Sequence, residues 1–98
     1  MTTMNDAHVL IIHEVDEYQK WKRIFDDAAD MRKAAGEIEF QLLAYEAEDR
    51  RLVHFSRWIS LDAARAFFES PELVEIRRIA GVRAPEFIYL REIEAGQL

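Results

Sequence analysis

Residues 8–27 read HVLIIHEVDEYQKWKRIFDD, and their hydrophobic pattern changes at Asp16. Before Asp16, residues 8–15 are rich in β-branched side chains and apolar at even and odd positions, which is typical of a strand buried on both faces. After Asp16, apolar side chains recur every three or four residues, which predicts one amphipathic helix. These side chains are Tyr18, Trp21, Phe25, Ala28, Met31 and Ala35. Asp16 suits the N-cap of this helix, with Gln19 completing a capping box, and Gly36 suits its C-terminal end.

The middle of the chain predicts a β-hairpin. Residues 38–46 and 51–59 read IEFQLLAYE and RLVHFSRWI, and the polar link between them is short. Two such runs joined by a short link should pair as antiparallel strands. Further along the chain, Pro85 marks a break before a last strand over residues 86–94.

Two helices are predicted between the hairpin and the last strand. Ser60 precedes a helix over residues 61–69, and the Ser70-Pro71 pair begins another over residues 71–80. The element order is therefore β-α-β-β-α-α-β. This order predicts an α+β, ferredoxin-like fold, with an antiparallel four-stranded sheet and helices on one face. A chain of 98 residues suits one domain over 1–98, with its core from about residue 8 to residue 92.

Three of the predicted strands carry apolar side chains on both faces. The helices can cover only one of these two faces. The second apolar set consists of Leu10, Ile12, Val53, Phe55, Ile88 and Leu90. Leaving this set exposed would create a larger apolar patch than monomers usually carry. We therefore expect a homodimer in which two sheets pack face to face.

Composition excludes several classes of function. Thirteen Lys and Arg against nineteen Asp and Glu give a net charge of −6, which repels phosphate backbones and predicts no nucleic-acid partner. The chain has no Cys, so it has neither a disulfide nor a thiolate site. Its N-terminal run MTTMNDAHVLIIHEV has no basic region and only four consecutive apolar residues, so neither a signal peptide nor a membrane span is expected. These features favour a cytoplasmic protein without a membrane partner.

Several runs resemble one known superfamily. They are VDEYQKWKRIFD at residues 15–26, FSRWISLDAARAF at residues 55–67, SPEL at residues 70–73 and PEFIYL at residues 85–90. Together they resemble the dimeric α/β-barrel superfamily, and within it the small proteins related to antibiotic biosynthesis monooxygenases. The resemblance extends over about residues 8 to 92 and includes uncharacterised and cyclase-like members. It implies a dimeric α/β barrel.

The resemblance also implies a function. It indicates a protein that binds a small hydrophobic or aromatic molecule, with cofactor-independent monooxygenation or cyclisation of polyketide-like substrates as the enzymatic form. In such enzymes the ligand lies between the sheet and the helices, and a tryptophan of the third strand, matched here by Trp58, lines the pocket. The alternative is a non-catalytic ligand-sensing or interaction module of the same fold, because one fold hosts many functions.

The pocket candidates have competing structural interpretations. Trp21 and Phe25 lie on the inward helical stripe, so they are core residues first and pocket walls only where the space is incompletely filled. Trp58 shares a strand face with His54 and Ser56, and a buried polar side chain needs a partner or a ligand. These three side chains are therefore pocket candidates, unless they bond to backbone or to neighbouring side chains.

His13 is the remaining candidate, as a base whose ordinary pKa lies near working pH. Its place near a strand end leaves open that it is simply solvated. His8 and His13 are five residues apart on one strand, so they face opposite ways and do not form a metal site. No metal ligand set and no specific catalytic residue follow from the sequence.

Overall fold

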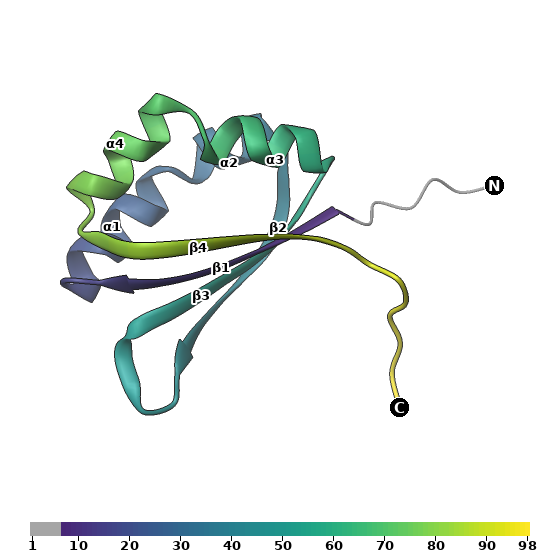
Figure 1. Ribbon diagram of the computed structural model, residues 1–98, viewed down its shortest axis with the longest axis horizontal. Helices are drawn as coiled ribbons and strands as arrows, with labels where there is room; N and C mark the ends of the chain where they lie inside the picture. The colour runs from purple at the N-terminus through teal and green to yellow at the C-terminus, as the bar shows by residue number, and fades with distance from the viewer. Residues whose placement is uncertain (1–6) are drawn as a thin grey trace.

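Four antiparallel strands form one sheet, and four helices cover one of its faces (Figure 1). The structure, a computed structural model, describes residues 7–98, so the first six residues of the N-terminal segment used to assess a signal peptide lie outside it. The elements are β1 (Ala7–Val15), α1 (Tyr18–Asp27), α2 (Ala29–Ala35), β2 (Glu37–Tyr45), β3 (Glu48–Trp58), α3 (Leu61–Phe68), α4 (Pro71–Ile79) and β4 (Val82–Arg91). Within the described residues, no helix combines the length and the apolar character needed to cross a membrane.

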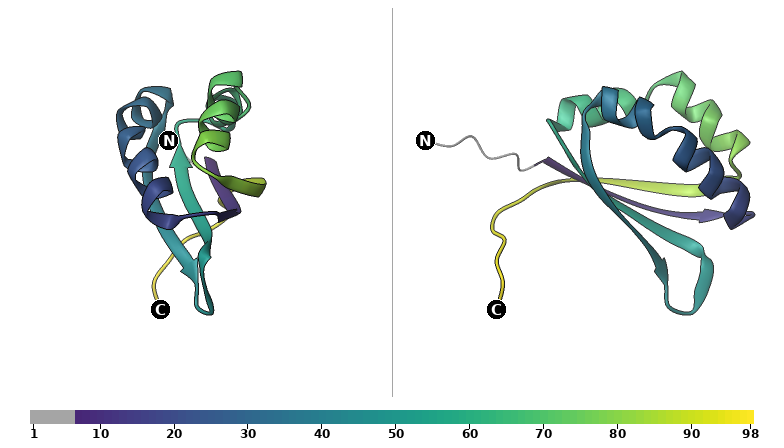
Figure 2. Two further views of the ribbon diagram at one scale, coloured as in Figure 1. Left: turned by 90° about the vertical axis from the view of Figure 1, so that its left-hand side faces the viewer. Right: turned by 180° about the vertical axis from the view of Figure 1, so that it is seen from behind.

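The strand order across the sheet is β2-β3-β1-β4, which confirms the predicted ferredoxin-like α+β fold. Ile11 on the central strand β1 pairs with His54 of β3 on one side and with Phe87 of β4 on the other. The helices lie in two rows, α1 with α2 and α3 with α4, both above the same face of the sheet (Figure 2). The strand residues that point toward the helices are therefore the ones that can form a site.

The predicted single helix after the first strand is wrong in two details. It is interrupted at Ala28, whose ψ of 3° leaves helical geometry, so α1 and α2 are separate helices. Glu17, not Asp16, is the N-cap of α1, and no side chain caps it. Asp16 is held elsewhere, because its backbone N–H donates to the carbonyl of Gly81 and its carboxylate pairs with Arg83.

The other helix signals are confirmed. Oγ of Ser60 accepts a hydrogen bond from the backbone N–H of Ala63 at 3.0 Å, and Oγ of Ser70 accepts one from Leu73 at 3.3 Å. Gly36 ends α2 with φ 124°, and a Cβ there would lie 2.7 Å from Cγ1 of Ile59. Both the backbone angle and the contact with β3's end therefore require glycine.

The last strand differs from its prediction. It runs from Val82 to Arg91, and Pro85 lies inside it instead of before it. Pro85 is tolerated because β4 is an edge strand, where a missing N–H breaks no ladder on the open side. Ala84 beside it has φ 46°, and the pairing with β1 shifts register between Ile12 and Glu14. The pairing of β4 with β1 is therefore locally irregular near Pro85.

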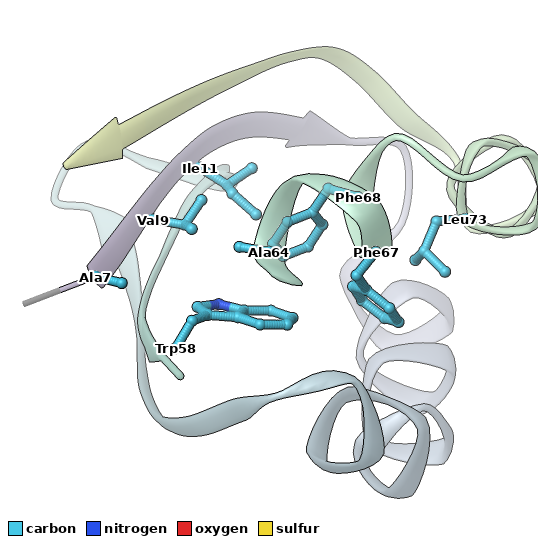
Figure 3. Packing of buried hydrophobic residues seen from close by; sticks show 8 residues of the cluster. All are labelled: Ala7, Val9, Ile11, Trp58, Ala64, Phe67, Phe68 and Leu73. Atoms are coloured by element: carbon cyan, nitrogen blue, oxygen red, sulfur yellow. The ribbon is translucent and has the colours of Figure 1, made fainter. Parts of the chain in front are cut away.

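The space between sheet and helices holds two clusters of buried side chains. The first consists of Ala7, Val9, Ile11, Trp58, Ala64, Phe67, Phe68 and Leu73 (Figure 3). The second consists of Val15, Trp21, Phe25, Leu52 and Ala80. The boundary between the two clusters lies along β1 and β3, where the helix-facing positions are His13 and His54.

No helix of residues 7–98 lies over the opposite face of the sheet, which carries the second apolar set. Leu10, Ile12, Val53, Phe55 and Ile88 are half-buried there, and Leu43 and Leu90 are exposed. The register pairs Leu10 with both Phe55 and Ile88, so these side chains form one continuous surface. The dimer that this surface suggests stays a prediction.

Candidate functional site

A cavity of about 80 Å³ lies between the sheet and the helices. Its walls are mainly apolar side chains from α1, α3, α4, β1 and β4. Four basic side chains also line it: His13, Arg32, His54 and Arg77. An apolar cavity with a few polar groups converging on it is the usual form of a small-molecule site.

His13 is the polar group with the most unusual environment. It is 6 % exposed, and its Nε2 atom is buried without a hydrogen-bond partner among the described residues. Burial, together with the positive charge of His54 when protonated and of Arg77, lowers the pKa of His13 from 6.5 to about 4. His13 is therefore a neutral imidazole at neutral pH, able to accept a proton or a hydrogen bond.

The rings of α1 border His13. The ring of Trp21 lies 5.3 Å from that of His13, and Phe25 stacks on Trp21 at 4.9 Å between centroids. Both aromatic residues are buried in the second cluster, and both line the cavity. Trp21 and Phe25 therefore belong to the core and also form part of the cavity wall.

His54 belongs to a buried chain of charged groups. Its Nε2 lies 2.8 Å from Oε2 of Glu37, whose Oε1 accepts a hydrogen bond from Nε of Arg32 at 2.5 Å. Arg32 also donates from Nη1 to the carbonyl of Phe25. All three charged or titratable side chains are at least nine-tenths buried, so the positive charge of Arg32 and the carboxylate of Glu37 compensate each other away from water.

Arg77 supplies a second fixed cation. Its Nη1 donates to the carbonyl of Phe68 at 2.9 Å, and its guanidinium lies 4.8 Å from the centroid of the Phe87 ring. Burial lowers the pKa of Arg77, yet a guanidinium keeps its charge at neutral pH. An anion formed in the cavity would therefore lie near a positive charge.

Trp58 lies in the first cluster, and neither Trp58 nor Ser56 lines this cavity. The indole N–H of Trp58 donates to Oγ of Ser56 at 2.8 Å, and the Trp58 ring packs against Phe67 and Phe68. The three candidates on the third strand are thus divided. His54 lines the cavity with His13, Trp21 and Phe25. Ser56 and Trp58 instead form a hydrogen bond with each other outside the cavity lining.

Three residues of the site were not predicted from the sequence. Arg77 had a usable signal, since Leu73, Arg77 and Ala80 are spaced i, i+4, i+7 and so share the buried face of α4. Glu37 and Arg32 had no comparable signal in the sequence. Glu37 is 17 positions before its partner His54, so only the folded hairpin brings them together.

Sequence comparison agrees with this architecture. The family model described as antibiotic biosynthesis monooxygenase matches residues 7–78. The chain belongs to the antibiotic biosynthesis monooxygenase family. No curated protein sequence matches the chain significantly.

Solved structures of this family share the fold. SnoaB, a cofactor-independent oxygenase from Streptomyces nogalater, is 15 % identical, with 94 % of this chain and 97 % of SnoaB covered and a TM-score of 0.77. A monooxygenase from the gene ActVA-Orf6 of Streptomyces coelicolor, solved with nanaomycin D, is 15 % identical, with 95 % of this chain and 92 % of that chain covered and a TM-score of 0.64. Likeness at this level of identity shows a common fold, and function must be argued from the site.

Proposed function

We propose that this family member binds a small aromatic molecule with an acidic hydroxyl group in the cavity. Nε2 of His13 accepts a hydrogen bond from that hydroxyl. The observation that carries the proposal is the buried Nε2 atom of His13, which has no partner among the described residues in a mainly apolar cavity. Leaving a buried polar atom unpaired costs roughly 1–3 kcal/mol. A ligand hydroxyl would recover that cost, whereas a purely apolar ligand would not.

The cavity volume limits the size of the ligand. An apolar cavity of about 150 Å³ is known to accept benzene, and this cavity measures about 80 Å³. A single ring therefore fits only if part of it extends beyond the walls. A polyketide-like substrate with several rings would require α1 and α4 to move apart.

The same site supports cofactor-independent oxidation as the finer form of the proposal. An activated CH₂ group next to an ionised hydroxyl would give one electron to dioxygen, and recombination followed by loss of water would yield a carbonyl. The sum is CH₂ plus O₂ giving C=O plus H₂O. His13 would take the hydroxyl proton, and Arg77 would stabilise the anion electrostatically.

The low pKa of His13 determines how the hydroxyl proton of the ligand is transferred. A free imidazolium with a pKa of about 4 would return its proton to a phenolate, so His13 first acts as a hydrogen-bond acceptor. Once an anion forms beside it, the attraction between the two charges raises the pKa of His13. Proton transfer and formation of the anion are therefore coupled.

Fluorescence tests the binding proposal. In a Trp58→Phe variant the remaining Trp21 lines the cavity, so phenol should quench its emission. Anisole, which has the same ring without a donor, should bind more weakly, by about two- to tenfold for one hydrogen bond. His13→Phe should reduce that difference. Equal binding of phenol and anisole, with no effect of His13→Phe, would contradict the proposal.

The small volume also favours a second candidate, a ligand-sensing module without turnover. Oxygen uptake separates the two. Anthrone, whose CH₂ group becomes a carbonyl in anthraquinone, should consume one equivalent of O₂ faster with the protein than with the His13→Phe variant. Binding of phenol without any acceleration of anthrone oxidation would favour the module.

We also propose that two copies pack through the uncovered sheet face. The support is the continuous apolar surface around Leu10, Phe55 and Ile88, which the same sheet face of a second copy would remove from water. Both cavities would then lie on the outside of the joined sheets, under the helices of each copy.

A further inference from the structure

We infer that Glu37 fixes the tautomer of His54, so that the cavity presents two imidazole acceptors and selects aromatic molecules with two hydroxyl donors. This inference rests on the proposed binding of hydroxylated aromatics at His13. It assigns Glu37 as a positioning residue and names the class of ligand more closely.

The contacts of Glu37 determine where the proton of His54 lies. Nε of Arg32 donates to one carboxylate oxygen at 2.5 Å, and Nε2 of His54 lies 2.8 Å from the other. A carboxylate with both oxygens in use acts as an acceptor, so Nε2 of His54 must be the donor. In the neutral ring this leaves Nδ1 as a bare nitrogen with a lone pair.

Nδ1 of His54 has no competing partner. The hydrogen bond to Glu37 is the only one that the His54 side chain makes with the described residues. The ring lines the cavity, and Nδ1 is its remaining polar atom. A ligand hydroxyl can therefore pair with it.

The ring of His54 is also held in orientation. Phe25 meets it edge to face at 5.1 Å with an interplanar angle of 87°, and Phe40 does so at 5.9 Å and 83°. Arg32 lies over Phe25, 3.8 Å from its centroid, and so helps to hold the ring that contacts His54. Preorganised acceptors discriminate between ligands because they do not readily turn toward another partner.

The sheet places the two acceptors close together. Ile11 pairs directly with His54, so His13, two residues further on β1, is the diagonal neighbour of His54 on the helix-facing side. Diagonal neighbours in a sheet are roughly 7–8 Å apart at the backbone. We therefore expect that two hydroxyl groups on one aromatic ring can reach both Nε2 of His13 and Nδ1 of His54.

A site with two fixed acceptors should reject a ligand that lacks one donor. The loss falls on the protein side, because one of the two imidazole nitrogens then makes no hydrogen bond to the ligand. Methylation of one hydroxyl keeps the ring and its oxygen but removes the donor. Catechol, resorcinol and hydroquinone with their monomethyl ethers are thus matched probes.

Calorimetric titration of the folded wild type with these six compounds tests the selectivity. At least one diol should bind about fivefold or more tightly than its own monomethyl ether. His54→Phe should remove that preference by lowering the affinity for each diol to that of its own monomethyl ether. Equal binding of each diol and its ether, with ether binding still dependent on His13, would overturn this inference but keep the proposed function. Failure of all six compounds to bind would overturn both.

The tautomer itself is measured by long-range ¹H–¹⁵N correlation spectra of the histidine rings. Wild type should show His54 with its proton on Nε2 and a bare Nδ1. Glu37→Gln, whose amide can also donate, should shift His54 toward the other tautomer, an effect that lost stability alone does not produce. If that variant does not fold, the wild-type spectrum still decides, because a proton on Nδ1 would overturn the inference.

Discussion

The indole N–H of Trp58 donates to Oγ of Ser56 at 2.8 Å, and both side chains are almost completely buried. The resemblance to the family suggested a tryptophan of this strand as a pocket residue. Here Trp58 closes the core under α3, and Trp21 of α1 lines the cavity instead. The two tryptophans should therefore report different events, with Trp58 sensing unfolding and Trp21 sensing ligands.

Loss of the Ser56 hydroxyl should destabilise the fold. Ser56→Ala leaves the indole N–H of Trp58 buried without an acceptor, which should lower the free energy of unfolding by about 1–3 kcal/mol. Urea denaturation measures this. In the Trp58→Phe background, where no N–H remains, Ser56→Ala should cost clearly less, and equal costs in both backgrounds would show that the hydrogen bond does not matter.

The Arg32–Glu37 pair should matter far more than an exposed pair. Arg32→Met removes the cation beside a buried carboxylate and should lower the free energy of unfolding by about 3–5 kcal/mol. Arg78 and Glu75 on α4 form a matched exposed pair, 2.5 Å apart, so Arg78→Met serves as the control and should cost at most about 1 kcal/mol. Similar losses in the two variants would mean that Glu37 is not a buried charge.

Acid should destabilise the protein through His13. Its pKa is about 4 in the folded chain and about 6.5 in the unfolded chain, so the unfolded chain binds more protons between these values. Stability is then complete above about pH 6.5 and is lost progressively as the pH falls toward 4. Between pH 7 and pH 5 the loss from this one group should be about 2 kcal/mol. Urea titrations at both pH values should show that His13→Phe lacks this part of the pH dependence, and a variant with the full wild-type dependence would contradict the assignment.

The uncovered sheet face should control assembly. Phe55→Glu puts a charge in the middle of the apolar surface and should convert a dimer into monomers or unfold it, since an unpaired buried charge costs several kcal/mol. Ile79→Glu, at a position on α4 that is 49 % exposed, is the matched control and should leave the dimer intact. Light scattering decides the matter. A wild type that is monomeric and folded at micromolar concentration would rule out the dimer.

Local signals predicted most of the fold. The change of hydrophobic period at Asp16 separated strand from helix, and Ser60 and Ser70 marked the starts of α3 and α4. The break at Ala28 could not be predicted from the sequence, because alanine is the best helix former and its propensity gives no reason for α1 to end there. Pro85 misled the prediction because a proline breaks a central strand but not an edge strand, and strand order is a property of the whole sheet.

The site was predicted less completely than the fold. Periodicity placed His54, Trp21 and Phe25 on inward faces. The cavity that they line could not be predicted in the same way, because it is the space that side chains from separate elements leave unfilled. Strand position alone left open whether His13 is solvated, whereas the structure buries it beside residues of α1 and α4. The partner of His54 depends on the pairing of β2 with β3, which brings Glu37 at the start of β2 beside it.

The most direct test of the account is the ¹⁵N resonance of Nε2 of His13 in the wild-type protein as phenol is added at pH 7. The account predicts that this resonance shifts in a saturable manner as the hydroxyl donates to Nε2, while that of His8, on the opposite face of the sheet, stays in place. Saturating phenol that quenches Trp21 but leaves the His13 resonance unchanged would contradict the central claim, because the ligand would then bind without the buried imidazole.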